Sequence, residues 1–280
     1  MKVMKIIADS GSTKTHWVVI SEGKQSKSFF SEGLNPYFLD SNEISLLVAN
    51  CFLGLNVEDV EEIHFYGAGC SLPEKCNIVQ SALKSVFPNS QIEIFSDLLA
   101  AAHALFGKTH GVACILGTGS NAAVYDGYRF VHKIQSLGYI LGDEGSGAYI
   151  GRQFLKMFLN KEMPNDLRID FAKKYHMDIP DILENIYKKP FPNRYLASFA
   201  SFASEHSEDR FINSVIRNAF SLFIKYQLNT LEFDKKMPVG FVGSIAFHFQ
   251  SILKDELQYQ GYTIGNVLKE PISELTQYHS

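Results

Sequence analysis

The chain opens on two apolar runs separated by a short polar turn. "VMKIIAD" and "HWVVI" flank "SGSTKT", so residues 1–20 are predicted to form a strand, a turn and a second strand. The phosphate loop of P-loop NTPases is excluded, because it needs GxxxxGK[ST] between a strand and a helix, and this turn is shorter and returns into a strand. The opening residues therefore predict a β-hairpin with a turn of Gly, Ser and Thr.

A second segment repeats this pattern, since "VACIL" meets "GTGSN" and continues as "AAVY". Gly11–Ser12 aligns with Gly119–Ser120 at an offset of 108 residues (119 minus 11), whereas Asp9 aligns with Gly117. A Rossmann motif does not fit, because "GTGSNA" lacks the third glycine and precedes a strand. The repeat predicts two similar halves, although so short a match also arises by chance.

Length and composition indicate a two-lobed globular protein. At 280 residues the chain exceeds one ordinary core, which favours two lobes with a cleft between them. A net charge of -4, from 26 basic and 30 acidic residues, and the lack of a basic stripe argue against a nucleic-acid partner. No apolar run reaches the roughly 20 residues that cross a bilayer. Four cysteines without CxxC spacing and no leader-like start predict reduced thiols and a cytoplasmic protein.

Further elements follow from composition and periodicity. Strands are predicted at 60–69 and 91–97, the latter entering a helix at 98–107 with Asp97 at the junction. Beyond residue 151 the chain is helix-rich, with apolar residues at helical spacing over 150–158 and 212–223. A last strand is predicted at 238–244, followed by one helix at 245–257. Residues 188–195, "KKPFPNRY", are the most loop-like internal stretch.

The glycine turns carry the candidate chemistry. Turns of Gly, Ser and Thr let backbone N–H groups approach a ligand and form an anion-binding concavity, so phosphate is the expected guest. Lys14 would add positive charge, and Asp9 could hold Mg²⁺ directly or through its waters. Each turn taken alone is also compatible with an ordinary hairpin.

Together, "DSGSTKT", "LGTGSN", the Ser96–Asp97 junction, "LGDEGSG" and "FVGS" resemble the actin-like ATPase superfamily, and within it the N-acetylglucosamine kinase and BadF-type ATPase group. The resemblance implies an α/β fold of two ribonuclease H-like lobes with an interlobe cleft and a helix-rich second lobe. We expect an N-terminal lobe over 1–110 and a C-terminal lobe over 111–280, with the last helix packing back on the first lobe. It also implies ATP and Mg²⁺ as cofactors, an amino sugar as the small-molecule partner, and a homodimer.

The resemblance assigns roles to the motif residues. The ATP-binding residues are Gly11, Ser12 and Thr13, with Lys14 beside them, Thr118 and Gly119 in the second phosphate segment, and Gly243 and Ser244 in the adenosine segment. The sugar contacts are Asn35, Ser120, Asn121 and Asp143. Asp97 matches the catalytic acid, which would accept a hydrogen bond from the attacking hydroxyl, O6 by analogy. The alternative is that Ser96 or Asp97 only caps the following helix.

The predicted activity is transfer of the γ-phosphate of ATP to N-acetylglucosamine or a close relative. Leu137 stands where such kinases carry a tryptophan, which leaves the identity of the sugar open. Two alternatives remain. One is a BadF-like ATPase that activates a 2-hydroxyacyl-CoA dehydratase or a related reductase through an iron–sulfur cluster, which needs cysteine thiolates, Cys114 being the thiol nearest a phosphate turn. The other is a non-catalytic sugar or nucleotide sensor on the same fold.

Overall fold

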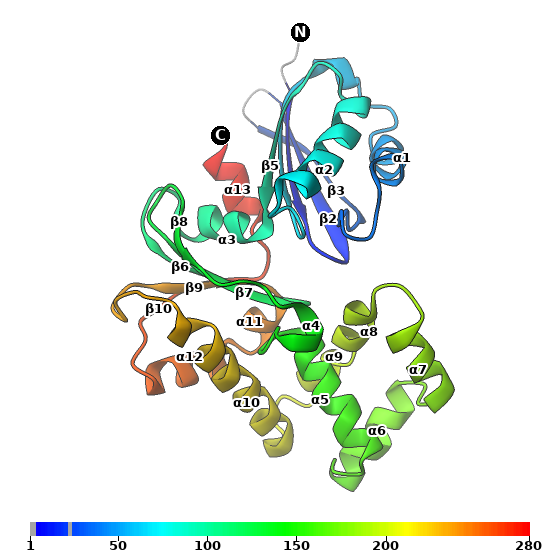
Figure 1. The fold of residues 1–280 in the computed structure, drawn as a ribbon, viewed down its shortest axis with the longest axis vertical. Helices are drawn as coiled ribbons and strands as arrows, with labels where there is room; N and C mark the ends of the chain where they lie inside the picture. Colours follow the sequence, from blue (N-terminus) through cyan, green and yellow to red (C-terminus); the bar gives the residue numbers. More distant parts are fainter. Residues whose placement is uncertain (1–3, 22–23) are drawn as a thin grey trace. The chain divides into compact units, whose positions relative to one another are not determined.

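The chain forms two compact units, each described here by itself. The computed structural model describes residues 4–21 and 24–280 (Figure 1). One unit contains the described residues up to Gly107 together with Glu270–Ser280, and the other is Lys108–Lys269. We call them unit 1 and unit 2. Unit 1 is thus assembled from two separate stretches of the sequence.

Unit 1 is built on a five-stranded sheet in the order β3-β2-β1-β4-β5. Its strands are β1 (Met4–Ser10), β2 (Lys14–Ser21), β3 (Lys24–Glu32), β4 (Val60–Gly67) and β5 (Gln91–Ser96). The first three strands are antiparallel neighbours, and β4 and β5 run parallel to β1. The predicted opening hairpin is confirmed. The edge strand β3 was not predicted, because its sequence "KQSKSFFSE" is mostly polar.

Helices cover both faces of this sheet (Figure 1). They are α1 (Ser41–Cys51), α2 (Pro73–Val86), α3 (Asp97–Phe106) and α13 (Ile272–Tyr278), with a 3₁₀ turn, η1, at Val57–Asp59. Ile6 and Trp17 lie in the core formed with α1 and α2. Ile7 lies on the opposite face of β1, in a smaller cluster with Ile272 and Leu275 of α13. Because successive side chains of a strand alternate between its faces, the continuous apolar run of β1 fits a strand that is buried on both sides.

Unit 2 repeats the same topology. Its strands are β6 (Gly111–Leu116), β7 (Ser120–Tyr125), β8 (Phe130–Lys133), β9 (Val239–Val242) and β10 (Ile264–Leu268), in the order β10-β9-β6-β7-β8. Read from the other edge, this is the strand order of unit 1. The strand ends Ser10 and Leu116 correspond at an offset of 106 (116 minus 10), two less than the offset of the sequence match. Gly11 therefore corresponds to Gly117 rather than to Gly119.

The prediction that the second half of the chain is helix-rich is confirmed. Unit 2 contains α4 (Gly138–Leu141), α5 (Gly147–Leu159), α6 (Asn165–Lys174), α7 (Ile179–Tyr187), α8 (Pro192–Ser198), α9 (Ser201–Glu205), α10 (Arg210–Tyr226), η2 (Leu228–Thr230), α11 (Ser244–His248) and α12 (Gln250–Tyr259). The apolar residues at helical spacing, such as Phe154 of α5 and Phe220 of α10, meet in one buried core. The pattern on α5 and α10 therefore identified the residues that face this core.

Three local predictions were wrong. The single helix expected over 245–257 is divided at Phe249, whose side chain is buried and whose backbone is not helical. The loop-like stretch 188–195 enters α8, which starts with Pro192, a residue well suited to a first helical position. Strand β10 follows the strand predicted to be last, because Gly265 and Asn266 interrupt its apolar pattern. Among the described residues, no helix is long and apolar enough to span a membrane.

Candidate functional site

The first glycine turn is closed and supported by backbone contacts. The Gly11 N–H donates to the carbonyl of Lys14 at 2.9 Å, and the Gly33 N–H donates to the carbonyl of Thr13 at 3.1 Å. A Cβ at residue 33 would lie 2.4 Å from the carbonyl oxygen of Gly11, so only glycine allows this approach. The Leu34 N–H also donates to Ser10 Oγ at 3.0 Å. The chain after β3 therefore braces the turn predicted to bind phosphate.

Two acidic residues lie at the carboxyl ends of the parallel strands beside this turn. Asp9 lies near the end of β1, and Asp97 directly follows β5. Burial raises the pKa of Asp9 to about 7, the Asp97 and Glu270 carboxylates add to this rise, and the Lys14 ammonium opposes it. In open α/β sheets this end of the strands is where ligands bind. The arrangement therefore concentrates negative charge at the carboxyl ends of β1 and β5.

The cap of α3 is made by Ser96. Its Oγ accepts a hydrogen bond from the Leu99 N–H at 3.2 Å, whereas Asp97 Oδ1 accepts one from the Leu98 N–H at 2.8 Å. The capping role that the sequence left open between the two residues thus falls to Ser96. Asp97 is half-buried in the first turn, where the helix dipole favours its ionised form.

Lys14 is held by a residue that the sequence analysis did not identify. Its Nζ lies 2.5 Å from Glu270 Oε1 and 4.6 Å from the centroid of the Phe30 ring. Glu270 Oε2 lies 3.4 Å from His16 Nδ1. Burial raises the pKa of Glu270, but Lys14 and His16 outweigh it, and the net pKa is lowered. A contact that spans 256 residues leaves no local signal in the sequence.

Asn35, the proposed sugar contact of unit 1, is buried close to the end of β4. Its Oδ1 accepts a hydrogen bond from the Tyr37 N–H at 3.0 Å and would lie 2.6 Å from a Cβ at Gly69. Gly69 has φ +85°, which also favours glycine at this position. The segment that begins by bracing the glycine turn therefore also positions Asn35.

In unit 2 the second glycine turn meets the "GDEGSG" segment. The Gly117 N–H donates to the carbonyl of Gly119 at 3.0 Å. The Gly147 N–H donates to the Gly117 carbonyl at 2.8 Å, and the Ala148 N–H to the Thr118 carbonyl at 3.0 Å. Two motifs about twenty residues apart in the sequence are thus joined by the first backbone N–H groups of α5.

Asp143 occupies a constrained position beside this turn. Its φ is 57°, in the left-handed region, and its Oδ1 accepts a hydrogen bond from the Ser120 N–H at 3.2 Å. Burial raises the pKa of Asp143 to about 6, and Glu144 adds to the rise, whereas the Ser120 N–H and Arg152 oppose it. Backbone strain and a perturbed carboxyl pKa together are typical of functional positions.

Ser120 and Asn121, the first two residues of β7, have different environments. The Ser120 hydroxyl is buried and accepts a hydrogen bond from Gln227 Nε2 at 2.7 Å. Asn121 is half-buried, and its Oδ1 accepts from the Ala122 N–H at 2.9 Å. Gln227, which lies directly after α10, was not identified from the sequence. The contacts of Ser120 therefore fit a residue that fixes the loop of Asp143.

The predicted adenosine segment lies against the same turn. Gly243 has φ 132°, and a Cβ there would lie 2.3 Å from the Leu116 carbonyl oxygen. Ser244 is exposed as the first residue of α11. Leu137, which stands at the expected tryptophan position, is exposed before α4, and Tyr139 is half-buried.

The residues of unit 1 fit a magnesium ion held mainly by water and phosphate. Across the described part of the chain, no group of three or more His, Cys, Asp and Glu side chains is arranged to hold a metal by itself. Mg²⁺ needs no such group, because it keeps several waters and takes one or two carboxylates together with substrate phosphates. The raised pKa of Asp9 shows a carboxylate that a nearby cation would stabilise in its charged form.

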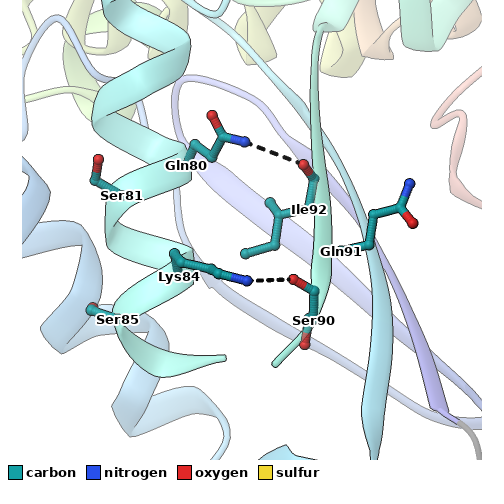
Figure 2. Close-up of a pocket in the computed structure, with 7 residues that line it drawn as sticks. All are labelled: Gln80, Ser81, Lys84, Ser85, Ser90, Gln91 and Ile92. Atoms are coloured by element: carbon teal, nitrogen blue, oxygen red, sulfur yellow. Dashed lines mark hydrogen bonds between the residues drawn. The ribbon is translucent and has the colours of Figure 1, made fainter. Parts of the chain in front are cut away.

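A hollow elsewhere in unit 1 has no relation to these residues (Figure 2). It has a volume of about 740 Å³ and is lined by Gln80, Ser81, Lys84, Ser85, Ser90, Gln91 and Ile92. It lies at the start of β5, whereas Asp97 follows the end of that strand. Lys84 Nζ donates to the Ser90 carbonyl, and Gln80 Nε2 to the Ile92 carbonyl, so these side chains fasten α2 to β5.

Two sheets of identical strand order, each with a glycine turn after its first strand, form the α/β fold expected of the actin-like ATPases. The family model described as the BadF/BadG/BcrA/BcrD ATPase family matches residues 8–274. The chain belongs to this family, and the resemblance recognised in the sequence is confirmed.

Individual relatives agree with this assignment. The N-acetylmuramic acid/N-acetylglucosamine kinase of Clostridium acetobutylicum is 24% identical, with 88% of each chain covered. A crystal structure from Porphyromonas gingivalis, of a protein assigned as an N-acetylglucosamine kinase, is 40% identical, with a TM-score of 0.91 over 99% of this chain and 98% of that one. A second structure with the same assignment, from Chromobacterium violaceum, has a TM-score of 0.73 at 15% identity over 99% of both chains, and supports the fold alone.

Proposed function

We propose that this protein is an ATP-dependent kinase that transfers the γ-phosphate of ATP to a hydroxyl of an amino sugar, N-acetylglucosamine or a close relative, at O6. The observation that carries the proposal is the placement of the Gly11–Lys14 turn, Asp9 and Asp97 at one edge of the unit 1 sheet. The names of the C. acetobutylicum and P. gingivalis relatives support the sugar as acceptor.

Asp97 is the proposed catalytic residue. Phosphoryl transfer to an alcohol passes through a loose transition state, so catalysis consists mainly of alignment and charge stabilisation. Asp97 accepts the hydrogen bond of the attacking hydroxyl and takes its proton late in the transfer. It stands in the first turn of α3, where the helix dipole favours negative charge. Ser96 caps the helix, so the catalytic and capping roles fall on different side chains.

The glycine turns are the proposed phosphate contacts. In unit 1, Gly11, Ser12 and Thr13 form the first phosphate segment. Ser12 and Thr13 present backbone N–H groups, the Gly11 N–H closes the turn on the Lys14 carbonyl, and Lys14 contributes charge. In unit 2, Thr118 and Gly119 form the second phosphate segment, and Gly243 and Ser244 the adenosine segment. Asp9 would hold Mg²⁺ through its waters, and the bound ion would neutralise charge on the phosphates.

Asn35, Asn121 and Asp143 are the proposed sugar contacts. Buried polar groups that bind a substrate hydroxyl strongly reject analogues that lack it, because they are then left unpaired. Ser120 is the fourth residue that the resemblance assigned to the sugar. Its backbone N–H donates to Asp143 and its hydroxyl accepts from Gln227, so we propose that it contributes by holding Asp143 in place. Substitution of Asp143 should therefore change sugar selectivity, and substitution of Ser120 should change the order of the loop that carries Asp143.

The cysteine environments do not favour the activator alternative. A cluster between two subunits needs thiolates at a surface. Cys70 and Cys114 are buried, which raises the pKa of the Cys70 thiol to about 12 and that of Cys114 well above its usual value. Cys51 and Cys76 are half-buried, and their pKa values are also raised by burial. A purely sensing protein would have no need of an acid placed as Asp97 is.

ADP release by the purified protein with Mg-ATP, measured over a panel of amino sugars and plain hexoses, tests the proposal. We expect an N-acetylated amino sugar to stimulate release, and Asp97→Asn to lower turnover about 100-fold or more with unchanged thermal stability. Ser96→Ala is the matched control: it should cost about 1 kcal/mol of stability through the lost cap, with much smaller loss of turnover. ATP binding without stimulation by any sugar would contradict the kinase proposal.

A further inference from the structure

We propose that Glu270 is a positioning residue that serves as the counter-ion of Lys14 beside the first glycine turn and releases it to the phosphates of the nucleotide. The inference rests on the proposed function, because it assigns the phosphates of ATP to that turn. It concerns a residue that lies outside every motif of the sequence.

The contacts of Glu270 are divided between two residues of one strand. Oε1 lies 2.5 Å from Lys14 Nζ, and Oε2 lies 3.4 Å from His16 Nδ1. Lys14 and His16 are two positions apart on β2, so both project from the same face of the sheet. The Phe30 ring of β3 contacts both, with its centroid 4.6 Å from Lys14 Nζ and 4.1 Å from the His16 ring centroid. The Lys14 ammonium thus contacts both Glu270 and the Phe30 ring beside the turn.

Glu270 is held in place by the helix that follows it. Ile272 and Leu275 of α13 are buried with Ile7 and Val18 of the sheet. Farther along the helix, Tyr66 Oη lies 2.8 Å from both His103 Nδ1 and His279 Nε2. Lys5 Nζ donates to the His279 carbonyl at 2.7 Å. The packing of α13 on the sheet therefore holds the Glu270 carboxylate beside β2. Only a third of the Glu270 side chain is exposed.

The charges around the glycine turn make the contact between Glu270 and Lys14 important for the binding of a phosphate. The carboxylates of Asp97 and Glu270 both act on Asp9 through space, and the Lys14 ammonium opposes them there. While Lys14 is paired with Glu270, part of its positive charge is already neutralised when a phosphate arrives. When Lys14 moves to the phosphate, its pairing with Glu270 is lost. Glu270 therefore competes with the nucleotide for the same cation.

The test is the affinity for ATP, with adenosine as the ligand that lacks phosphates, measured by calorimetry. We expect Glu270→Gln to bind ATP about two- to tenfold more tightly and to lower its KM, with adenosine affinity and kcat little changed, because exposed ion pairs are modest in strength. Lys14→Met should weaken ATP binding and abolish the effect of Glu270→Gln in the double variant. Glu270→Asp, which keeps the charge on a shorter side chain, should bind ATP no more tightly than Glu270→Gln does.

Unit 1 offers a matched control in Glu62, which lies 3.1 Å from Lys5 Nζ and 3.2 Å from His64 Nε2. Glu62→Gln removes a similar pair away from the turn and should leave ATP affinity unchanged. Unchanged or weaker ATP binding by a folded Glu270→Gln protein would overturn the inference while leaving the kinase proposal intact. Should Glu270→Gln fail to fold, Glu270→Ala takes its place, and unchanged or weaker ATP binding by the folded Glu270→Ala protein would overturn the inference. If the unmodified protein does not bind ATP, the kinase proposal and the inference on Glu270 are both wrong. If it binds ATP but no sugar serves as acceptor, only the kinase proposal is wrong.

Discussion

Asp143 combines a left-handed backbone with a carboxylate whose charge is costly to bury. Because its pKa is raised to about 6, the folded protein binds a proton more readily than the unfolded chain does, so its penalty is largest above pH 6 and disappears below the ordinary aspartate range. Asn keeps an oxygen that can accept from Ser120 and tolerates positive φ.

We therefore expect Asp143→Asn to raise the free energy of unfolding by about 1–2 kcal/mol at pH 8. This gain should shrink as the pH falls from 7 to 4, and the variant should lose sugar affinity. Urea unfolding at pH 8 and pH 4, with sugar binding measured in parallel, checks both effects. An equal gain at both pH values would show that the charge of Asp143 is not the cause.

Whether a site residue can be proposed from the sequence depends on how far along the chain its contacts lie. Asp9 and Asp97 were identified because each stands at a strand end that local patterns reveal. Glu270 and Gln227 were missed, since their partners lie 256 and 107 residues away. A lone Glu before a proline, or a lone Gln after a helix, carries no local signal of such a partner.

At the scale of elements, the first turn depends on the close approach of a neighbouring segment. A Cβ at Gly33 would overlap the Gly11 carbonyl, whereas a Cβ at Gly11 would meet only the Lys14 carbonyl oxygen at 3.7 Å. We expect Gly33→Ala to lower stability by about 1–3 kcal/mol through this overlap and to weaken ATP binding. Gly11→Ala serves as the control for stability and should melt at nearly the temperature of the unmodified protein. Thermal melting measures the loss of stability and calorimetry measures ATP binding by Gly33→Ala, and equal losses of stability in the two variants would contradict this account.

The helix α13 is attached through histidines that are neutral in the folded protein. Burial lowers the pKa of His103 to about 4, and burial together with the neighbouring His64 lowers that of His279 to about 3. The unfolded chain takes up these protons near pH 6.5, so the stability that they contribute is complete above that pH and is lost as the pH falls towards 4.

We expect the attachment of α13 to unit 1 to weaken as the pH falls from 6.5 to 4.5. The raised pKa of Asp9 acts in the opposite direction in the same unit, because its buried charge is lost on protonation. Trp17, the single tryptophan, is buried in unit 1, so its fluorescence reports on this unit alone. His279→Gln should reduce the change in stability between pH 6.5 and 4.5. A pH profile of Trp17 fluorescence that is the same in the variant and in the unmodified protein would argue against the histidines as its cause.

For the whole molecule, the duplicated strand order explains why so much of the fold could be predicted. Apolar runs and the two glycine turns mark β1, β2, β6 and β7 directly in the sequence. The polar edge strand β3 and the interrupted β10 escaped, because edge strands need less apolar surface than central ones. The return of the last helix to the first lobe was expected from the family resemblance alone. The packing of Ile272 and Leu275 is long-range, and periodicity does not show it.

That return has a consequence for the order in which the protein is made. Strands β1 to β5 leave the ribosome first, yet the helix that covers Ile7 and Val18 is translated only after the whole of unit 2. Unit 2 is continuous and can complete its core while synthesis proceeds, because domains generally fold as units during translation. Unit 1 must wait with part of one sheet face uncovered, so the earlier half of the chain is the later one to finish folding.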